Sequence, residues 1–145
     1  MSLSLKILLL LFFVSCTHKE SSPIAMENPL PACPDSPNCK LRSHEFQTEY
    51  TKLVSATSIV LEEMGAREIS EIKTDSTIQI DAVFKIPVFG WLDDVNIIIT
   101  PTENDSSITY AHFRSASREG YSDLGVNNRR LNKIYKNVQN ELNSK

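Results

Sequence analysis

Two arginines in one predicted strand are the residues whose type and spacing suggest the most chemistry. Arg114 and Arg118 share one face of that strand and lie about 13 Å apart along it, because a strand rises about 3.3 Å per residue. One carboxylate cannot reach both guanidinium groups, so we expect a separate acidic partner for each. The candidate partners are Asp93 and Asp94, at the start of the neighbouring strand, and Asp123 in the following turn.

Two interpretations of this cluster stay open. In the first, guanidinium–carboxylate pairs, which form two parallel hydrogen bonds, hold the strand ends and the start of the last helix in place. In the second, the arginines and the backbone N–H groups at the start of that helix bind a phosphate or a carboxylate. The binding hypothesis covers six residues, namely Arg114, Arg118, Asp93, Asp94, Asp123 and Asn127.

A catalytic interpretation of the same region has less support. Strand alternation places His112 on the face opposite to Ser115 and Ser117. The sequence also has no Gly-x-Ser-x-Gly elbow, no phosphate-binding glycine loop and no zinc-binding His pair. We therefore predict no catalytic residue, no cofactor and no metal ion. The residue types of a nucleophilic triad are nevertheless present, in His112, Ser115, Ser117, Asp94 and Asp123.

Trp91 is the second feature with two interpretations. It follows Val88-Phe89-Gly90, so large apolar side chains gather where two predicted strands meet. Such a group either fills a corner of the core or lines the mouth of an apolar pocket.

The elements that must position these residues follow from hydrophobic periodicity. Between Phe46 and Met64, apolar residues recur at spacings of three and four, which predicts a helix that ends at Gly65. A second amphipathic helix is predicted over Val126–Asn143, with Asp123 or Asn127 as its cap. Four strands are predicted over Arg67–Lys73, Ile78–Ile86, Trp91–Thr100 and Ser107–Ser117.

Short loops between the predicted strands favour antiparallel neighbours. We therefore expect a two-layer α+β domain over residues 33–145. Its four-stranded antiparallel sheet carries the N-terminal and the C-terminal helix on one face.

The first sixteen residues predict export and lipid attachment. The apolar run 7–14 would rise about 12 Å as a helix, far less than the roughly 30 Å of a hydrocarbon core, which is typical of a signal peptide. Ser15-Cys16 resembles the end of a bacterial lipobox, although Phe13 stands where Leu is usual. We predict a signal peptide at 1–15 and a lipid on Cys16, with cleavage after Ser15 without lipid as the alternative.

The lipid would anchor the protein to a membrane through a flexible tether at 16–32, which is rich in Ser, Pro, Glu and Asn. Thr17, rather than Asp, follows Cys16. In a Gram-negative host this predicts an outer-membrane lipoprotein that faces the periplasm.

The two remaining cysteines are expected to pair. Cys33 and Cys39 are separated by five residues, two of them prolines, and an exported chain meets an oxidising compartment. A disulfide over so short a loop would stabilise the fold by about 2 kcal/mol. The alternatives are a redox-active pair and a metal site that also uses His44.

Three blocks of the sequence are similar to the domain of unknown function 1499 family. They are CPDSPNC at 33–39, GWLDDV at 90–95, and the stretch 114–130 that begins RSASR. The resemblance implies a small protein of a type that is often exported or membrane-associated. No biochemical activity attaches to the family, so the resemblance supplies no catalytic residues.

Composition narrows the function further. The chain has 145 residues and a formal net charge of −3, which fits one domain and argues against a nucleic-acid surface. We expect a non-enzymatic exported lipoprotein whose domain binds a partner or a small anionic or apolar ligand. The alternatives are a hydrolase that acts on an anionic envelope substrate and a purely structural envelope factor.

Overall fold

The chain folds into a five-stranded antiparallel sheet and two helices, an α+β architecture. The computed structural model describes residues 27–87 and 89–144. The signal peptide predicted at 1–15 and the lipid predicted on Cys16 lie outside these residues. In chain order the elements are β1 (Cys39–Phe46), α1 (Tyr50–Glu63), β2 (Glu68–Lys73), β3 (Ile78–Lys85), β4 (Leu92–Pro101), β5 (Thr109–Ser117) and α2 (Val126–Asn143).

The sheet has one strand more than the four expected. Its order is β1-β5-β4-β3-β2, so β1 lies at an edge beside β5, with Cys39 opposite Ala116 and Phe46 opposite Thr109. The expectation of four strands is wrong because β1 reads CKLRSHEF, with polar side chains on both faces. Such a strand is held by backbone pairing with its neighbour rather than by a buried face, so no hydrophobic alternation reveals it.

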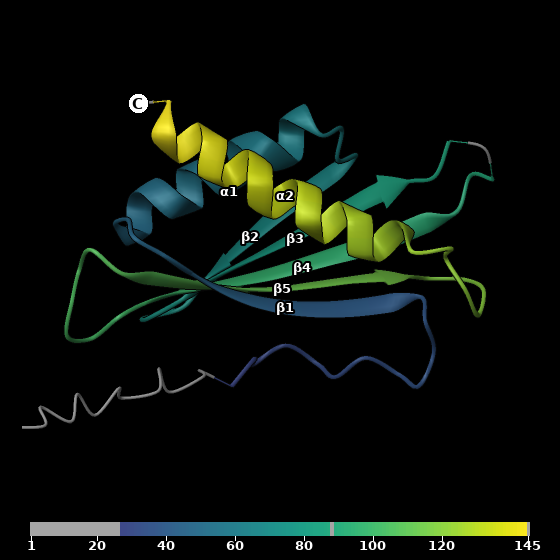
Figure 1. The fold of residues 1–145 in the computed structure, drawn as a ribbon, viewed down its shortest axis with the longest axis horizontal. Helices are drawn as coiled ribbons and strands as arrows, with labels where there is room; N and C mark the ends of the chain where they lie inside the picture. The colour runs from purple at the N-terminus through teal and green to yellow at the C-terminus, as the bar shows by residue number, and fades with distance from the viewer. Residues whose placement is uncertain (1–26, 88, 145) are drawn as a thin grey trace, which may run out of the picture.

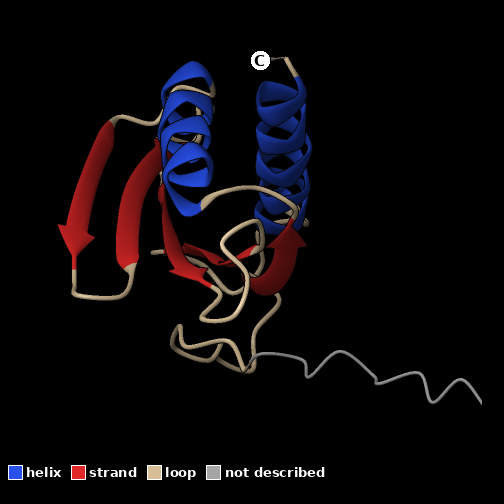
Figure 2. Ribbon diagram, turned by 90° about the vertical axis from the view of Figure 1, so that its left-hand side faces the viewer, coloured by secondary structure: helices blue, strands red, loops and turns tan. Residues whose placement is uncertain are grey.

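Both helices contact each other and the sheet. Helix α1 contacts β2, β3 and β4, whereas α2 contacts β1 and β5. Both ribbon views show the two helices side by side (Figures 1 and 2). The core cluster combines residues from strands and helices, including Leu53, Leu61, Ile80, Ile97, Phe113 and Ile134. Each large side chain buried in this way contributes about 1.5–3 kcal/mol of transfer free energy.

The segment that leads into β1 is also packed. Leu30 is buried, and Asn28 Nδ2 donates a hydrogen bond of 3.1 Å to the backbone oxygen of Arg42. Figure 1 shows this segment running along the side of the sheet away from the helices. The packed part of the described chain therefore begins ahead of Cys33, inside the stretch expected to be a tether.

The predicted disulfide is confirmed. Cys33 and Cys39 are joined by a bond of 2.03 Å, which ties this segment to the start of β1. No helix in the described residues is long and apolar enough to cross a bilayer.

One end of the molecule collects several chain reversals. Strands β3 and β5 finish there, and β4 and α2 begin there, at the right of Figure 1. Two loops, 86–91 and 118–125, join these elements. The candidate site lies at this end.

Candidate functional site

A buried ion pair lies at the centre of this end. Arg130 on α2 donates from Nη2 to Asp93 Oδ2 of β4 at 2.6 Å, and their side chains are 8% and 1% exposed. Arg130 Nη1 also donates to Ser115 Oγ at 3.1 Å and to Asn127 Oδ1 at 2.8 Å. Three hydrogen bonds therefore hold this guanidinium in place, and the ring of Phe84 lies 5.1 Å from its central carbon.

Asn127 extends the network across the fold. Its Nδ2 donates to the backbone oxygen of Asn38 at 2.9 Å and to Ser117 Oγ at 3.0 Å, and its Oδ1 accepts from Ser115 Oγ. Asn38 in turn donates from Nδ2 to the backbone oxygen of Gly120. One buried amide thus joins the segment ahead of β1, strand β5 and helix α2.

The prediction of Asp123 or Asn127 as the N-cap of α2 is wrong, because Gly125, with a φ of 79°, stands at that position. Asp123, two residues earlier, still stabilises the start of the helix. Its carboxylate accepts from the backbone N–H of Gly125 at 2.9 Å and from that of Asn127 at 2.6 Å. Burial raises the pKa of the Asp123 carboxyl, but these backbone hydrogen bonds lower it by more in total, so the pKa lies below its ordinary value. The backbone N–H groups available to an external anion at this helix start are therefore already used in part.

The two strand arginines have different partners. Arg118 forms two-pronged hydrogen bonds to Asp94 of 2.8 and 3.0 Å, and this half-exposed pair raises the pKa of the guanidinium. Arg114 reaches only Asn96 Oδ1, at 3.4 Å, and its buried Nε has no partner among the described residues. We expected a separate acidic partner for each arginine, and among the described residues only Arg118 has one.

Arg130, the partner of Asp93, was not among the predicted site residues. The sequence nevertheless contains a signal that Arg130 is buried. Arg130 lies three residues after Asn127 and next to Leu131, on the buried stripe of α2 that continues to Ile134. A polar pair at helical spacing on a buried stripe needs polar partners from the sheet.

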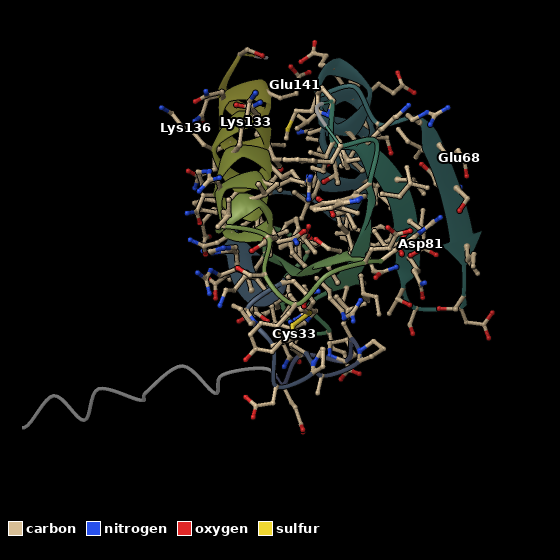
Figure 3. The ribbon with its side chains drawn as sticks, turned by 90° about the vertical axis from the view of Figure 1, so that its right-hand side faces the viewer. Cys33, Glu68, Asp81, Lys133, Lys136 and Glu141 are labelled. Atoms are coloured by element: carbon tan, nitrogen blue, oxygen red, sulfur yellow. A yellow bond between two sulfur atoms is a disulfide. The ribbon has the colours of Figure 1, made fainter. Side chains whose placement is uncertain are left out.

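A cavity of about 360 Å³ opens beside this network. Its apolar walls come from both loops and the start of α2, and its polar lining includes Asp93, whose Oδ1 is buried and accepts no hydrogen bond from the described residues. Figure 3 looks at the molecule from this end, with the disulfide at Cys33 below the ribbon of the helices. The apolar lining residues are Ile86, Phe89, Trp91, Leu124 and Val126.

Trp91 lies at the mouth of this cavity rather than in a corner of the core. It is 41% exposed, and its ring stacks on that of Phe89 with centroids 4.7 Å apart and planes inclined by 19°. Aromatic pairs of this kind present a large, rigid apolar surface.

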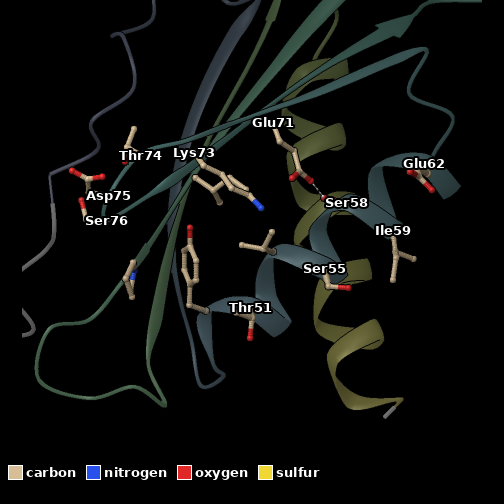
Figure 4. A pocket seen from close by; sticks show the side chains of 14 residues that line it. Thr51, Ser55, Ser58, Ile59, Glu62, Glu71, Lys73, Thr74, Asp75 and Ser76 are labelled. Carbon is tan, nitrogen blue, oxygen red and sulfur yellow. Dashed lines mark hydrogen bonds between the residues drawn. The ribbon is translucent and has the colours of Figure 1, made fainter.

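A second hollow lies between α1 and the edge strand β2. This groove of about 780 Å³ is lined mostly by exposed polar side chains, and the one hydrogen bond drawn there joins Ser58 Oγ to Glu71 Oε1 at 2.8 Å (Figure 4). A ligand in this groove would have to displace water from these polar side chains, and that desolvation offsets part of the gain from its apolar contacts.

The residue types of a triad are not brought together. Ser115 is buried in the network with Arg130 and Asn127, whereas His112 Nδ1 lies 2.9 Å from Ser43 Oγ on β1. Burial lowers the pKa of His112 below 6.5.

His44 does not join the disulfide cysteines. Its ring stacks on that of Tyr135 with centroids 4.0 Å apart, and burial, followed by the nearby charge of Arg42, lowers its pKa. Within residues 27–87 and 89–144, no group of three His, Cys, Asp or Glu side chains is arranged to hold a metal ion.

A comparison with known protein families gives one match. The family described as "Protein of unknown function (DUF1499)" matches residues 29–138. No curated protein matches the chain.

Similar solved structures come from several bacteria. They include a conserved protein from Geobacillus kaustophilus, with 12% identity over 73% of this chain and 95% of that one and a TM-score of 0.45. A protein from Mesorhizobium loti has 12% identity, coverage of 73% and 97%, and a TM-score of 0.48. A START superfamily protein from Mycobacterium smegmatis has 11% identity, coverage of 73% and 97%, and a TM-score of 0.37.

Proposed function

Since the chain belongs to the DUF1499 family, whose function is unknown, we propose from its site that it is a non-enzymatic binding protein. The domain holds a small, mostly apolar molecule that carries a hydrogen-bond donor. The binding place is the cavity at the end of the molecule, which we name the end cavity. The protein acts as an exported lipoprotein, anchored through Cys16 to the outer membrane and facing the periplasm if its host is Gram-negative.

The observation that carries this proposal is the free oxygen of Asp93. Its carboxylate is 1% exposed, and only Oδ2 is satisfied, by Arg130. A buried acceptor without a partner costs about 1–3 kcal/mol, so a donor that reaches Oδ1 recovers that free energy. The apolar walls, with Ile86, Val126 and the stacked rings of Phe89 and Trp91, would bury the rest of such a molecule.

The same geometry gives less support to an anionic ligand. Arg118 is occupied by Asp94, and Arg130 is occupied by Asp93. The charged residues that line the end cavity are three acids and one base, namely Asp93, Glu119, Asp123 and Arg129. An anion would meet a negative surface there, whereas a hydroxyl or amine head group would find acceptors.

Two molecules that differ only in the head group test the proposal. 1-Octanol donates a hydrogen bond, whereas octanoate is an anion with the same chain length. We expect the mature protein in nanodiscs to bind octanol more tightly than octanoate, measured by the change in emission of Trp91, the single tryptophan of the chain. Empty nanodiscs give the reference for partition into lipid.

A pair of variants locates the binding. Val126→Phe fills the end cavity, whereas Val54→Phe makes the same change in the groove between α1 and β2. We expect the first to abolish octanol binding and the second to leave it unchanged. Tighter binding of octanoate, or binding that survives Val126→Phe, contradicts the proposal.

A purely structural role is the second candidate, and the buried network favours it. Asp93, Ser115, Asn127 and Arg130 hold three elements together without any ligand. In that case neither octanol nor octanoate binds, and variants of the network change only the stability. The hydrolase alternative gains nothing from the geometry, because Ser115 is buried and already hydrogen-bonded to Asn127.

A further inference from the structure

The large apolar side chains that the described residues leave exposed are concentrated at one end. Phe89 is 62% exposed, Trp91 41%, Tyr121 74% and Leu124 84%. The fifth exposed residue of this kind, Ile72, lies on β2 opposite Gln79 at the start of β3, and so near the other end of the sheet. We name the first four the apolar rim.

The apolar rim is one surface rather than two. Phe89 and Trp91 belong to loop 86–91, and Tyr121 and Leu124 belong to loop 118–125. Both loops line the end cavity, with Phe89, Trp91 and Leu124 among its walls, so their tips are neighbours around its mouth. A contiguous exposed apolar patch on a small domain marks a place that another apolar surface covers.

Leu124 shows that the exposure has a cost. Its φ of 51° is in the left-handed region, which a leucine adopts only at a cost of about 1–2 kcal/mol. Glycine or asparagine would relieve that strain and would also remove an apolar side chain from water. Arg129 Nη1 donates to the backbone oxygen of Leu124 at 2.9 Å and so helps to hold this turn, but that bond does not use the leucine side chain, which stays 84% exposed. A surface outside the domain could bury that side chain.

We propose that the apolar rim docks into the interfacial zone of the membrane that carries the lipid anchor, with the end cavity opening toward the bilayer. Trp and Tyr concentrate at membrane–water interfaces, where one part of the ring is in the apolar phase and one part is hydrated. Leu and Phe at the tips of two loops add apolar area that the acyl boundary covers. The ligand of the end cavity is then a molecule dissolved in the lipid phase.

The length of chain outside the structure allows this orientation. The proposed tether from Cys16 to the first described residue contains the eleven residues 16–26, which span at most about 36–40 Å when extended. Asn28 is bonded to Arg42, which is only three residues into β1 from Cys39. That offset is about 10 Å along the strand. An anchored chain can therefore bring the end with the apolar rim down to the bilayer surface.

The charges near the rim point to the apolar interface rather than to anionic head groups. Loop 86–91 has no charged residue. In the other loop, Arg118 is paired with Asp94, and the carboxylate of Asp123 is bonded to the start of α2. The remaining charged residue of that loop is an exposed acid, Glu119, which anionic head groups would repel. Docking is therefore expected on zwitterionic vesicles and to be insensitive to salt. This inference rests on the proposed function, which includes the lipid on Cys16.

Trp91 reports the docking directly, because it is the only tryptophan. The mature chain is reconstituted in phosphatidylcholine vesicles whose acyl chains carry bromine near the head group. We expect bromine to quench Trp91, its emission to move to shorter wavelength, and aqueous iodide to lose access to it. Full access of iodide to Trp91, with no quenching by bromolipid, overturns the proposal.

Two rim variants and one matched control make the test specific. Leu124→Asn suits the left-handed backbone, and Tyr121→Ser changes a residue that does not line the end cavity. Each removes apolar area and is expected to reduce the ratio of inserted to water-exposed Trp91 about tenfold. Ile72→Ser removes an apolar residue that is 54% exposed and lies near the other end of the sheet, and it should change nothing. Equal effects of all three variants refute the docking.

Failure of docking and failure of the proposed function give different results. Tyr121→Ser should weaken insertion and leave octanol binding intact, whereas Val126→Phe should abolish octanol binding and leave insertion intact. Mass spectrometry of the mature chain shows whether Cys16 is acylated. An acylated chain whose Trp91 stays in water refutes the docking alone, and an unacylated chain whose Trp91 is quenched by added vesicles refutes the anchor alone.

Discussion

Removal of Arg130 should be among the most damaging single changes in the buried network beside the end cavity. Arg130→Leu keeps the apolar stem of the side chain but leaves the carboxylate of Asp93, which is 1% exposed, without its cationic partner. Breaking a buried pair in this way costs about 3–5 kcal/mol. Since a domain of this size has about 5–15 kcal/mol of stability, the variant should lose a large part of it.

Unfolding in guanidinium chloride, followed by circular dichroism, measures this loss of the free energy of unfolding. Arg118→Leu is the matched control, because it removes the half-exposed ion pair with Asp94, and we expect its unfolding midpoint to be nearly that of the natural chain. The double variant Asp93→Leu/Arg130→Leu removes both buried charges and should recover most of the lost free energy of unfolding.

The double variant also separates the pair from the rest of the network. A coupling free energy of several kcal/mol between positions 93 and 130 is expected from the cycle of variants. Equal shifts of the unfolding midpoint in Arg130→Leu and Arg118→Leu would contradict this prediction, because the buried and the half-exposed ion pair would then be equivalent.

Three further changes test other parts of the fold. Asp123→Ala should cost about 1 kcal/mol by removing the acceptor for two backbone N–H groups of α2. Because the folded pKa of Asp123 lies below 3.8, its contribution is present above that value and is lost as pH falls through the folded pKa, so acid titration of the variant should be flatter there. Burial lowers the folded pKa of His112 and of His44 below 6.5, so the unfolded chain binds protons more readily than the folded one. The free energy of unfolding should therefore fall as pH drops from 6.5 toward the folded pKa values. His112→Gln should make this dependence of the melting temperature on pH less steep. Reduction of Cys33–Cys39 should lower the free energy of unfolding by about 2 kcal/mol, and an unchanged melting temperature after complete reduction contradicts this.

Elements with a buried apolar face could be located from the sequence. Helix α2 runs over Val126–Asn143 as expected, because Leu131, Ile134 and Val138 mark its buried stripe. The alternation from Ile78 onward likewise identifies β3, whose helix-facing side chains are buried. In both elements the local pattern and the packing agree, so periodicity alone is sufficient.

Elements that depend on long-range partners could not be located in this way. Strand β1 carries Lys40, Arg42 and His44 on the face that continues to Phe46, so its place is set by pairing with β5 rather than by its own pattern. The partners of the charged residues could not be predicted for the same reason. Asp93 and Asp94 point to opposite faces of β4, and the alternation places Asp93 on the buried face with Val95. The alternation does not show that its partner is Arg130, because that contact depends on the packing of α2.

A crystal structure of the protein with 1-octanol would show directly whether the end cavity binds a molecule with a hydrogen-bond donor. We expect the hydroxyl within about 2.5–3.0 Å of Asp93 Oδ1 and the alkyl chain against Trp91 and Val126. Octanol seated only in the groove between α1 and β2, with nothing but water next to Asp93, would contradict this expectation.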